Sequence, residues 1–442
     1  MALTRAERAI CDEIARREQD VVELTSALVG FDTTARGNGD PPREEAALQG
    51  YLADRLRAAG ASVEVWEPDA KEMEGRPLVP PGLGFEGRPQ LVASFGGEGG
   101  GRSLLLNGHI DAVSAEPIEE WTSDPFEAEV RDGLIYGRGS CDMKGGVASI
   151  VLAAEVLAGL GVPLQGDLLV ATNTDEESSG AGGSAVVAHG IQADAGIVTE
   201  PTGFEVWVSC RGSEYGVVTV PGRPGHAEVP HPHWREGGAV NAIEKSTFVI
   251  DAIRALRAEW AVRDGLDHPR LSRPDLVPTV ARAGEWAVTY PASMRMTIAV
   301  LYVPAQADGA GWGSEIRREV EEWLRKETSQ DDWLAENPPT ISWWPNGVMP
   351  LEIPPDDPIV GTVVGASEAV GRPGPLTGLD SWYDGATYTL LGGIPSVGYG
   401  PSGITATGAS VAHTIDEYVP VADLVACAQG LAVAAMRFCG TG

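Results

Sequence analysis

Residues 104–113 read LLLNGHIDAV, in which an apolar run is followed, after an asparagine and a glycine, by a histidine, an isoleucine and an aspartate. A short apolar run of this kind is typical of a β-strand that is covered on both faces. The chain continues through the glycine-rich turn YGRGSCDMKGG (136–146) into GGVASIVLAAEVLAGL (145–160), which is long enough for a buried helix. A strand, a glycine turn and an apolar helix in this order favour an α/β fold.

Strands and helices alternate on both sides of this stretch. Apolar residues at helical spacing predict one amphipathic helix over about 10–28 and a second over about 44–59. Further strands are predicted at SVEVWE (62–67), DLLVATNT (167–174) and AGIVTE (195–200). The segment between Trp66 and Gly101 is rich in proline and glycine, so we expect it to be a surface excursion.

The pattern changes after Arg211-Gly212. The order strand, helix, strand, helix is predicted from VVTVPG (217–222), a long helix beginning near Gly238, MRMTIAVLYV (294–303) and EIRREVEEWLRK (315–326). From about Asn346 the helix–strand alternation returns and ends in a predicted helix over 421–438. We therefore predict one α/β domain built from residues 1–212 and 346–442, interrupted by a smaller α+β domain of residues 213–345.

Composition and charge exclude several classes of protein. The 442 residues are 43% hydrophobic, which is enough for substantial cores in two or three domains. A formal net charge of −31 repels a phosphate backbone, so nucleic-acid binding is not expected. The five cysteines are odd in number and far apart, which favours a reducing compartment over a disulfide framework. The charged N-terminus lacks a signal-peptide core and no apolar run approaches about 18 residues, so we expect a cytoplasmic protein outside the membrane.

Acidic and histidine side chains recur where predicted strands end. His109 and Asp111 are two residues apart, so both side chains lie on one face, where one can ligate a metal and the other can orient it. Asp142 sits in the glycine-bracketed turn before the apolar helix. Glu176 and Glu177 are neighbours on extended chain and point oppositely, so one can bind a metal while the other handles a water. Each of these residues also has an ordinary structural interpretation when it is taken alone.

Two further positions complete the pattern. Glu200 follows AGIVT, and His413 lies in VAHTIDEY before the last helix. Open α/β sheets place their sites at strand ends, and two histidines with three carboxylates suit two divalent ions such as zinc, with one carboxylate bridging them. A water between two such ions is a nucleophile at neutral pH, and an unligated carboxylate can carry its proton to a leaving amine.

Five motifs together, NGHID, GRGSCDMKGG, DEE, TEP and the late histidine, resemble a family of metallopeptidases and deacylases. That family includes acetylornithine deacetylase, succinyl-diaminopimelate desuccinylase, aminoacylase and glutamate carboxypeptidase, and the resemblance covers essentially the whole chain. It implies a zinc-peptidase-like catalytic domain with an inserted lid or dimerisation domain. It also implies that His109 and Glu200 serve one metal, that Glu177 and His413 serve the other, and that Asp142 bridges them.

The resemblance assigns the remaining catalytic roles. Asp111 would orient His109, and Glu176 would be the general base and acid. GRPGHAEVP places His226 where relatives have an oxyanion-stabilising histidine, often from the partner subunit, and a donor of this kind supplies a few kcal/mol of transition-state stabilisation. We expect two divalent ions, zinc first with manganese or cobalt as alternatives, no other cofactor-binding residues, and a homodimer or larger homo-oligomer formed through the inserted domain.

The chain departs from the family where relatives hold the carboxylate of an amino-acid substrate. Ala299 and Leu301 occupy the positions of the Asp and Arg of a D-x-R pattern, and Val288 replaces a common asparagine. A second D-x-R pattern is replaced by Asp384-Gly385-Ala386, with Trp382 as the other candidate for the arginine position. An arginine fork binds a carboxylate through two parallel hydrogen bonds, so its loss predicts a substrate other than an ordinary N-acyl-α-amino acid. A flatter, more apolar or aromatic molecule is expected instead.

Three arginines stay open as anion partners, namely Arg138, Arg211 and Arg295. The leading hypothesis is a two-metal hydrolase that cleaves a C–N bond, most simply an amide, of a small molecule. The alternatives are a hydrolytic deaminase acting on an aromatic or amidine-type amine, an aminopeptidase or dipeptidase, and a catalytically silent relative that only binds.

Overall fold

The computed structural model describes residues 2–37, 40–41, 43–345, 347–405 and 407–441. The chain forms two compact units, of which the first contains Met1–Ser209, Leu351–Gly378 and Tyr383–Gly442. The second contains Cys210–Pro350 and the short segment Leu379–Trp382. The predicted boundary at Asn346 falls on a residue outside the described ranges.

The first unit is built around a mixed sheet with the strand order β1-β2-β6-β3-β7-β15-β8-β13, in which β14 also pairs with β8. Its strands are β1 (Ser62–Trp66), β2 (Gln90–Phe95), β3 (Leu104–His109), β6 (Leu168–Asn173), β7 (Ala195–Val198), β8 (Val206–Cys210), β13 (Leu351–Glu352), β14 (Leu376–Leu379) and β15 (Ser396–Gly398). The central strands β6, β3, β7 and β15 run parallel to one another. A smaller sheet joins β4 (Glu129–Arg131), β5 (Leu134–Tyr136) and β16 (Tyr418–Pro420).

Helices cover both faces of this sheet. Alternate residues of β3 point to opposite faces, and residues on each face contact a helix. A Cβ on Gly108 would meet Val147 of α5 (Gly145–Gly159), whereas the side chain of Asn107 donates to the Tyr388 hydroxyl of α11 (Gly385–Leu390) at 2.9 Å. The remaining helices of the unit are α1 (Arg5–Arg16), α2 (Glu18–Val29), α3 (Glu45–Ala58), α4 (Ala70–Met73), α6 (Ala181–Ala188), α10 (Pro358–Ala369) and α12 (Val421–Cys439). The sheet is therefore buried on both sides, as the leucine run predicted.

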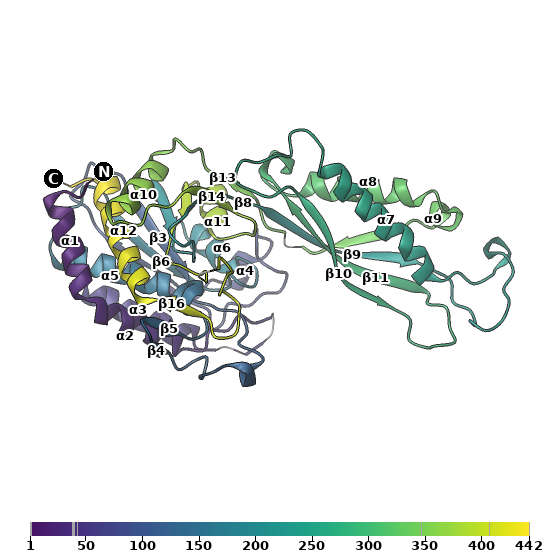
Figure 1. The fold of residues 1–442 in the computed structure, drawn as a ribbon, viewed down its shortest axis with the longest axis horizontal. Coiled ribbons are helices and arrows are strands. Elements are labelled where there is room, and N and C mark those ends of the chain that lie inside the picture. The colour runs from purple at the N-terminus through teal and green to yellow at the C-terminus, as the bar shows by residue number, and fades with distance from the viewer. Residues whose placement is uncertain (1, 38–39, 42, 346, 406, 442) are drawn as a thin grey trace. The chain divides into compact units, whose positions relative to one another are not determined.

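The two ends of the chain build the same unit. The N-terminal helix α1 (purple) and the C-terminal helix α12 (yellow) lie side by side, and α12 also packs against α5 and α10 (Figure 1). Among the described residues, α12 is the one helix that is long and apolar enough to cross a membrane, but 83% of its most apolar window is buried inside the protein. Its composition is thus that of a core helix.

The second unit is a four-stranded antiparallel sheet with helices on one face. The strand order is β10-β11-β9-β12, formed by β9 (Gly212–Pro221), β10 (Asp275–Ala283), β11 (Ser293–Tyr302) and β12 (Thr340–Trp343). Its core joins apolar side chains of β9 and β11 to those of α7 (Ala242–Trp260), α8 (Ser314–Thr328) and α9 (Asp332–Glu336). The fold class, an α/β domain with an inserted α+β domain, is confirmed.

Three local predictions were wrong. The single helix over 10–28 is two helices, α1 and α2, because the backbone leaves helical geometry at Arg17. The segment between Trp66 and Gly101 is no surface excursion, since it contains β2, which pairs with β1 and β6 inside the sheet. In the inserted unit, β10 was missed because its outer part, residues 278–283, is exposed and lacks the apolar pattern of a core strand.

Candidate metal centre

The sheet brings the predicted residues to one edge. In the parallel pair β3–β6, His109 lies opposite Asn173, so the turn that carries Glu176 and Glu177 begins beside it. In the pair β3–β7, Asn107 lies opposite Val198, and Glu200 follows two residues later. Three strand ends therefore deliver an imidazole and three carboxylates to the same region, as expected for an open α/β sheet.

Asp142 lies between the two histidines. Its Oδ1 is 3.1 Å from His109 Nε2, and its Oδ2 is 3.3 Å from His413 Nε2. It belongs to the short helical turn η2 (Ser140–Lys144), in which Asp142 and Met143 leave helical backbone angles and are joined by a cis peptide bond. A carboxylate that offers one oxygen to each histidine has the arrangement of a bridging ligand.

Glu177 completes the cluster on the side of His413. Its Oε1 lies 3.1 Å from His413 Nε2, and ligand atoms of His109, Asp142 and Glu177 all lie within 4.8 Å of one another. His413 has a φ of 63°, a left-handed conformation that few residues other than glycine adopt. A non-glycine residue in this conformation costs the folded protein of order 1–3 kcal/mol. The surrounding loop thus holds this imidazole in place at a conformational cost.

Asp111 has a different set of contacts from the one predicted. The Nδ1 atom of His109 lies 2.9 Å from the backbone oxygen of Asp111 but 3.6 Å from its carboxylate. The carboxylate instead accepts hydrogen bonds from the backbone N–H groups of Glu176 (3.3 Å) and Glu177 (3.1 Å). Asp111 therefore fixes the histidine through its main chain and the glutamate turn through its side chain.

Burial and mutual repulsion raise the pKa of several acids in the cluster. Burial comes first for Glu176 and Glu200, whose pKa values lie well above the usual range, and neighbouring carboxylates add to the shift. Burial likewise raises the pKa of Asp111 to about 8. Within the described residues, the buried Oε1 of Glu200 has no hydrogen-bond partner. A buried, unpaired carboxylate is costly unless a cation neutralises it.

Neighbouring carboxylates raise the pKa of both the buried His109 and the half-exposed His413. Burial opposes the charged form of His109, but its hydrogen bond to Asp142 and the charges of Glu200 and Glu176 raise its pKa well above the usual value. Hydrogen bonds to Asp142 and Glu177 raise the pKa of His413 to about 10. Burial would raise the pKa of Asp142, but both histidines outweigh it and hold that pKa far below the usual range. Protons on the histidines supply the positive charge that this acidic cluster needs.

This donor set fits divalent metal ions. Zinc binds histidine nitrogen and carboxylate oxygen at about 2.0–2.2 Å, so neighbouring ligand atoms on a tetrahedral ion lie about 3.3 Å apart. The three contacts of 3.1, 3.3 and 3.1 Å that join His109, Asp142, His413 and Glu177 match that spacing. Together with the unpaired oxygen of Glu200, the residues present are those that two ions sharing Asp142 require.

Metal affinity is expected to rise with pH. At pH values below about 10, a metal that binds His413 must displace its proton, so each unit of increasing pH strengthens the apparent affinity about tenfold for that proton. Conversely, the interaction of protonated His413 with its carboxylates stabilises the metal-free protein fully below pH 6.5, its ordinary pKa, and is lost as the pH rises through 10. Titration calorimetry at pH 7 in buffers of different ionisation enthalpy counts the protons released.

A matched histidine provides the control for that experiment. His413→Ala should release one proton fewer. His189→Gln removes the imidazole that follows α6 and lies 3.1 Å from Glu64 of β1, and it should release as many protons as the wild type. Equal proton release from all three proteins would contradict the assignment of His413 as a ligand.

The other predicted residues lie elsewhere or have other partners. His226 is an exposed residue of the second unit, where its backbone oxygen lies 2.9 Å from His231 Nε2, and its proposed role stays a prediction. Arg138 is excluded as an anion partner because it is 2% exposed and paired with buried Glu417. Arg295 is exposed on β11. The sequence analysis missed Glu417, although an acid directly before the strand β16 was a signal for a buried pair.

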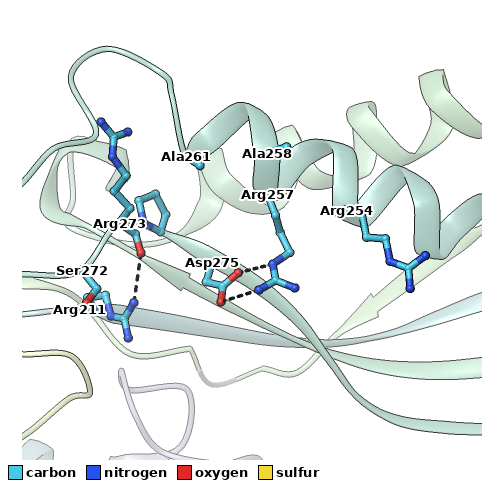
Figure 2. A pocket seen from close by; sticks show the side chains of 9 residues that line it. Arg211, Arg254, Arg257, Ala258, Ala261, Ser272, Arg273 and Asp275 are labelled. Atoms are coloured by element: carbon cyan, nitrogen blue, oxygen red, sulfur yellow. Dashed lines mark hydrogen bonds and ion pairs between the residues drawn. The ribbon is translucent and has the colours of Figure 1, made fainter.

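Arg211 belongs to a pocket of the second unit with a volume of about 580 Å³ (Figure 2). The pocket lies beside α7 and the start of β10 and also contains Arg254, Arg257, Ala258, Ala261, Ser272, Arg273, Pro274 and Asp275. Arg211 Nε donates to the backbone oxygen of Asp380 (2.9 Å) and its Nη1 to that of Arg273 (3.2 Å), while Arg257 binds Asp275 through two nitrogens. Arg254, Arg257 and Arg273 each form an ion pair with an aspartate, so most of the positive charge in this pocket is already neutralised by the protein.

Comparison with known proteins places the chain in a family. The profile of Peptidase family M20/M25/M40 matches residues 105–437. The chain is 24% identical over 431 residues to an N-formyl-4-amino-5-aminomethyl-2-methylpyrimidine deformylase of Bacillus subtilis (strain 168), with 93% of both chains covered. It is 37% identical over 222 residues to a succinyl-diaminopimelate desuccinylase of Xanthomonas euvesicatoria pv. vesicatoria (strain 85-10), which covers 48% of this chain and 52% of that one.

A solved structure shares the fold. The YXEP protein of Bacillus subtilis, described as a dinuclear metal binding peptidase from the M20 family, aligns with a TM-score of 0.62 at 16% identity over 96% of this chain and 99% of that one. The family profile spans well over half of the present chain and includes His109, Asp142, Glu177, Glu200 and His413. The chain therefore belongs to Peptidase family M20/M25/M40.

Proposed function

We propose that this protein is a two-metal hydrolase that cleaves an amide C–N bond in a small molecule other than an ordinary N-acyl-α-amino acid. The observation that carries the proposal is the position of Asp142, whose two oxygens lie 3.1 and 3.3 Å from two different histidines. Zinc is the proposed metal, with manganese and cobalt as alternatives. His109 and Glu200 would hold one ion, Glu177 and His413 the other, and Asp142 both.

The protein groups provide positioning and proton transfer. When bound, the ions would lower the pKa of a water and polarise the substrate carbonyl. Glu176 would accept the proton of the attacking water and return it to the nitrogen of the leaving amine. Burial raises the pKa of Glu176, which suits a group that must return a proton as well as accept one. The Asp111 carboxylate accepts the backbone N–H of Glu176 and so holds the turn that carries this residue.

The substrate is proposed to be an N-acyl amine on a flat aromatic or heteroaromatic scaffold. Ala299 and Leu301 stand at the positions where the family resemblance expects an Asp and an Arg, so the carboxylate-binding fork is absent there. The deformylase relative is named for an N-formylated pyrimidine.

We further propose that the protein is cytoplasmic and forms a homodimer or larger homo-oligomer through the second unit. The edge strand β10 supports this because residues 278–283 are exposed at the end of the sheet, and an unpaired strand edge is a template for pairing with another chain. His226, also in this unit, would stabilise the oxyanion that develops on the scissile carbonyl.

A product screen tests the proposed function. The metal-reconstituted protein should release formate or another acid, together with a primary amine, from N-formyl and N-acetyl derivatives of aminomethyl heteroaromatics. We expect kcat/KM for these compounds to exceed that for acetylornithine and N-acyl-glutamates by at least about tenfold, since an unpaired carboxylate costs a few kcal/mol. A chelator should abolish turnover, and zinc, manganese or cobalt should restore it.

Each product identifies a different outcome of this screen. Ammonia without a liberated acid would replace the amidohydrolase proposal with a deaminase, and faster turnover of N-acyl-α-amino acids would overturn the proposed substrate class. Release of amino acids from unblocked peptides would indicate an aminopeptidase or dipeptidase. Turnover that persists at full rate after metal removal would overturn the two-metal mechanism.

A further inference from the structure

A buried ion pair that no catalytic assignment uses lies directly behind the metal ligands. Arg138 is 2% exposed and Glu417 is fully buried, and Arg138 Nη1 binds Glu417 Oε2. The guanidinium also lies 5.1 Å from the ring of Trp121. A charged pair removed from water in this way is rarely favoured over apolar packing on stability grounds alone, so its other contacts indicate what it does.

The second carboxylate oxygen of Glu417, which is not in the ion pair, binds the backbone beside and at Asp142. Glu417 Oε1 accepts hydrogen bonds from the backbone N–H groups of Cys141 (2.9 Å) and Asp142 (3.1 Å). Both groups lie in the turn η2, which Gly139 enters with a φ of 77°. The first N–H groups of a helical turn have no partner within the turn, so a side-chain acceptor decides their orientation. Here that acceptor is one carboxylate oxygen.

Arg138 connects the same pair to the second ligand loop. Its Nη2 donates to the backbone oxygen of Thr414 at 3.2 Å, one residue after His413. The backbone oxygen of Glu417 in turn accepts from Gly137 N at 3.0 Å. The pair therefore contacts the backbone of Asp142 and the residue after His413, and the side chains of Asp142 and His413 lie 3.3 Å apart.

We propose that Glu417, held by Arg138, is a positioning residue that sets the separation of Asp142 and His413 and thereby the affinity for both metal ions. This inference rests on the proposed two-metal function. Asp142 shares its oxygens between two histidines at 3.1 and 3.3 Å, so rotation of its peptide group lengthens one contact or both. Groups that orient metal ligands from behind typically change metal affinity by about 10–100-fold when they are replaced.

The decisive experiment compares two buried glutamates of the first unit. Glu417→Gln keeps the size of the side chain, but its NH₂ group must face either Arg138 or the two N–H donors, so one set of contacts is lost. Glu45→Gln is the matched control, because Glu45 is also buried, pairs with Arg36 at 3.0 Å and accepts a backbone N–H from Arg43 at 3.1 Å. Its partners Arg36 and Arg43 are not adjacent in sequence to any proposed metal ligand.

Zinc dissociation constants are measured by competition with a chromophoric chelator, alongside thermal unfolding of the metal-free proteins. We expect Glu417→Gln to raise the zinc dissociation constants at least tenfold, and Glu45→Gln to leave them within about twofold of wild type while losing comparable thermal stability. Arg138→Lys keeps the positive charge but loses the Nη2 contact to the backbone oxygen of Thr414. It should raise the zinc dissociation constants by less than Glu417→Gln does.

The outcomes separate this inference from the proposed function. Wild-type zinc affinity in Glu417→Gln, with two ions bound and activity retained, would overturn the positioning role and leave the hydrolase proposal standing. Equal loss of affinity in Glu45→Gln would also overturn it, because the effect would then follow from stability alone. A wild-type protein that binds no zinc, manganese or cobalt would overturn both proposals. If Glu417→Gln does not fold, unchanged affinity in Arg138→Lys overturns the positioning role.

Discussion

Glu176→Gln is expected to lower kcat by a factor of about 10²–10⁴ and to leave the metal content at the wild-type level. The amide cannot accept a proton from the attacking water, while the proposed metal ligands are other residues. Glu176 contributes a backbone N–H to Asp111 at 3.3 Å, and this contact survives the substitution because it involves the main chain. Initial rates and elemental analysis of the same preparation measure both quantities.

Glu119→Gln serves as the control, since Glu119 is an exposed residue of the short turn η1 (Ile118–Glu120). It should keep wild-type kcat and metal content. If Glu176→Gln turned over substrate at the wild-type rate, another group would have to move the proton. If it lost its metals together with its activity, Glu176 would be a ligand and not the proton carrier.

Asp142→Asn is expected to weaken the binding of both metal ions by about 100-fold or more and to abolish turnover at ordinary metal concentrations. The substitution keeps the shape of the side chain but removes the charge that both histidines share. An effect larger than that of Glu417→Gln is expected because Asp142 would touch the ions, whereas groups behind the ligands change affinity by about 10–100-fold. Elemental analysis after dialysis against trace metal gives the number of ions per chain.

A surface aspartate provides the matched control for this variant. Asp54→Asn removes a carboxylate that is 84% exposed and pairs with its helical neighbour Arg57, so two ions per chain should remain. Loss of one ion with full retention of the other in Asp142→Asn would show that Asp142 belongs to a single ion and would contradict the bridging assignment.

The positions of the site residues could be predicted because strand ends in an α/β sheet are visible in the sequence. Each short apolar run that ends in an acid or a histidine corresponds to a parallel strand, and the parallel register then brings His109, Glu177 and Glu200 to one edge. Asp142 and His413 lie in a glycine turn and a late loop, and it was the resemblance of GRGSCDMKGG and the late histidine to the family motifs that implied their roles as ligands. Their spatial proximity follows from topology.

The contacts made by individual side chains could not be predicted in the same way. Arg138 was kept as a possible anion partner, and only the fold shows that Glu417, 279 residues away in the sequence, is its partner. Asp111 was expected to hold His109 with its carboxylate, but its own backbone oxygen is nearer, and no sequence pattern distinguishes these two acceptors. The strand β2 was missed because proline and glycine in the preceding residues hid a six-residue strand.

The discontinuous composition of the first unit determines when its metal site can be completed during synthesis. The second unit contains the continuous segment Cys210–Pro350, so the ribosome has delivered nearly all of it while the first unit still lacks α12 and His413. Domains generally fold as units as they emerge. A nascent chain that ends anywhere before residue 413 lacks a proposed metal ligand, so the proposed metal site is complete only after His413 has left the ribosome.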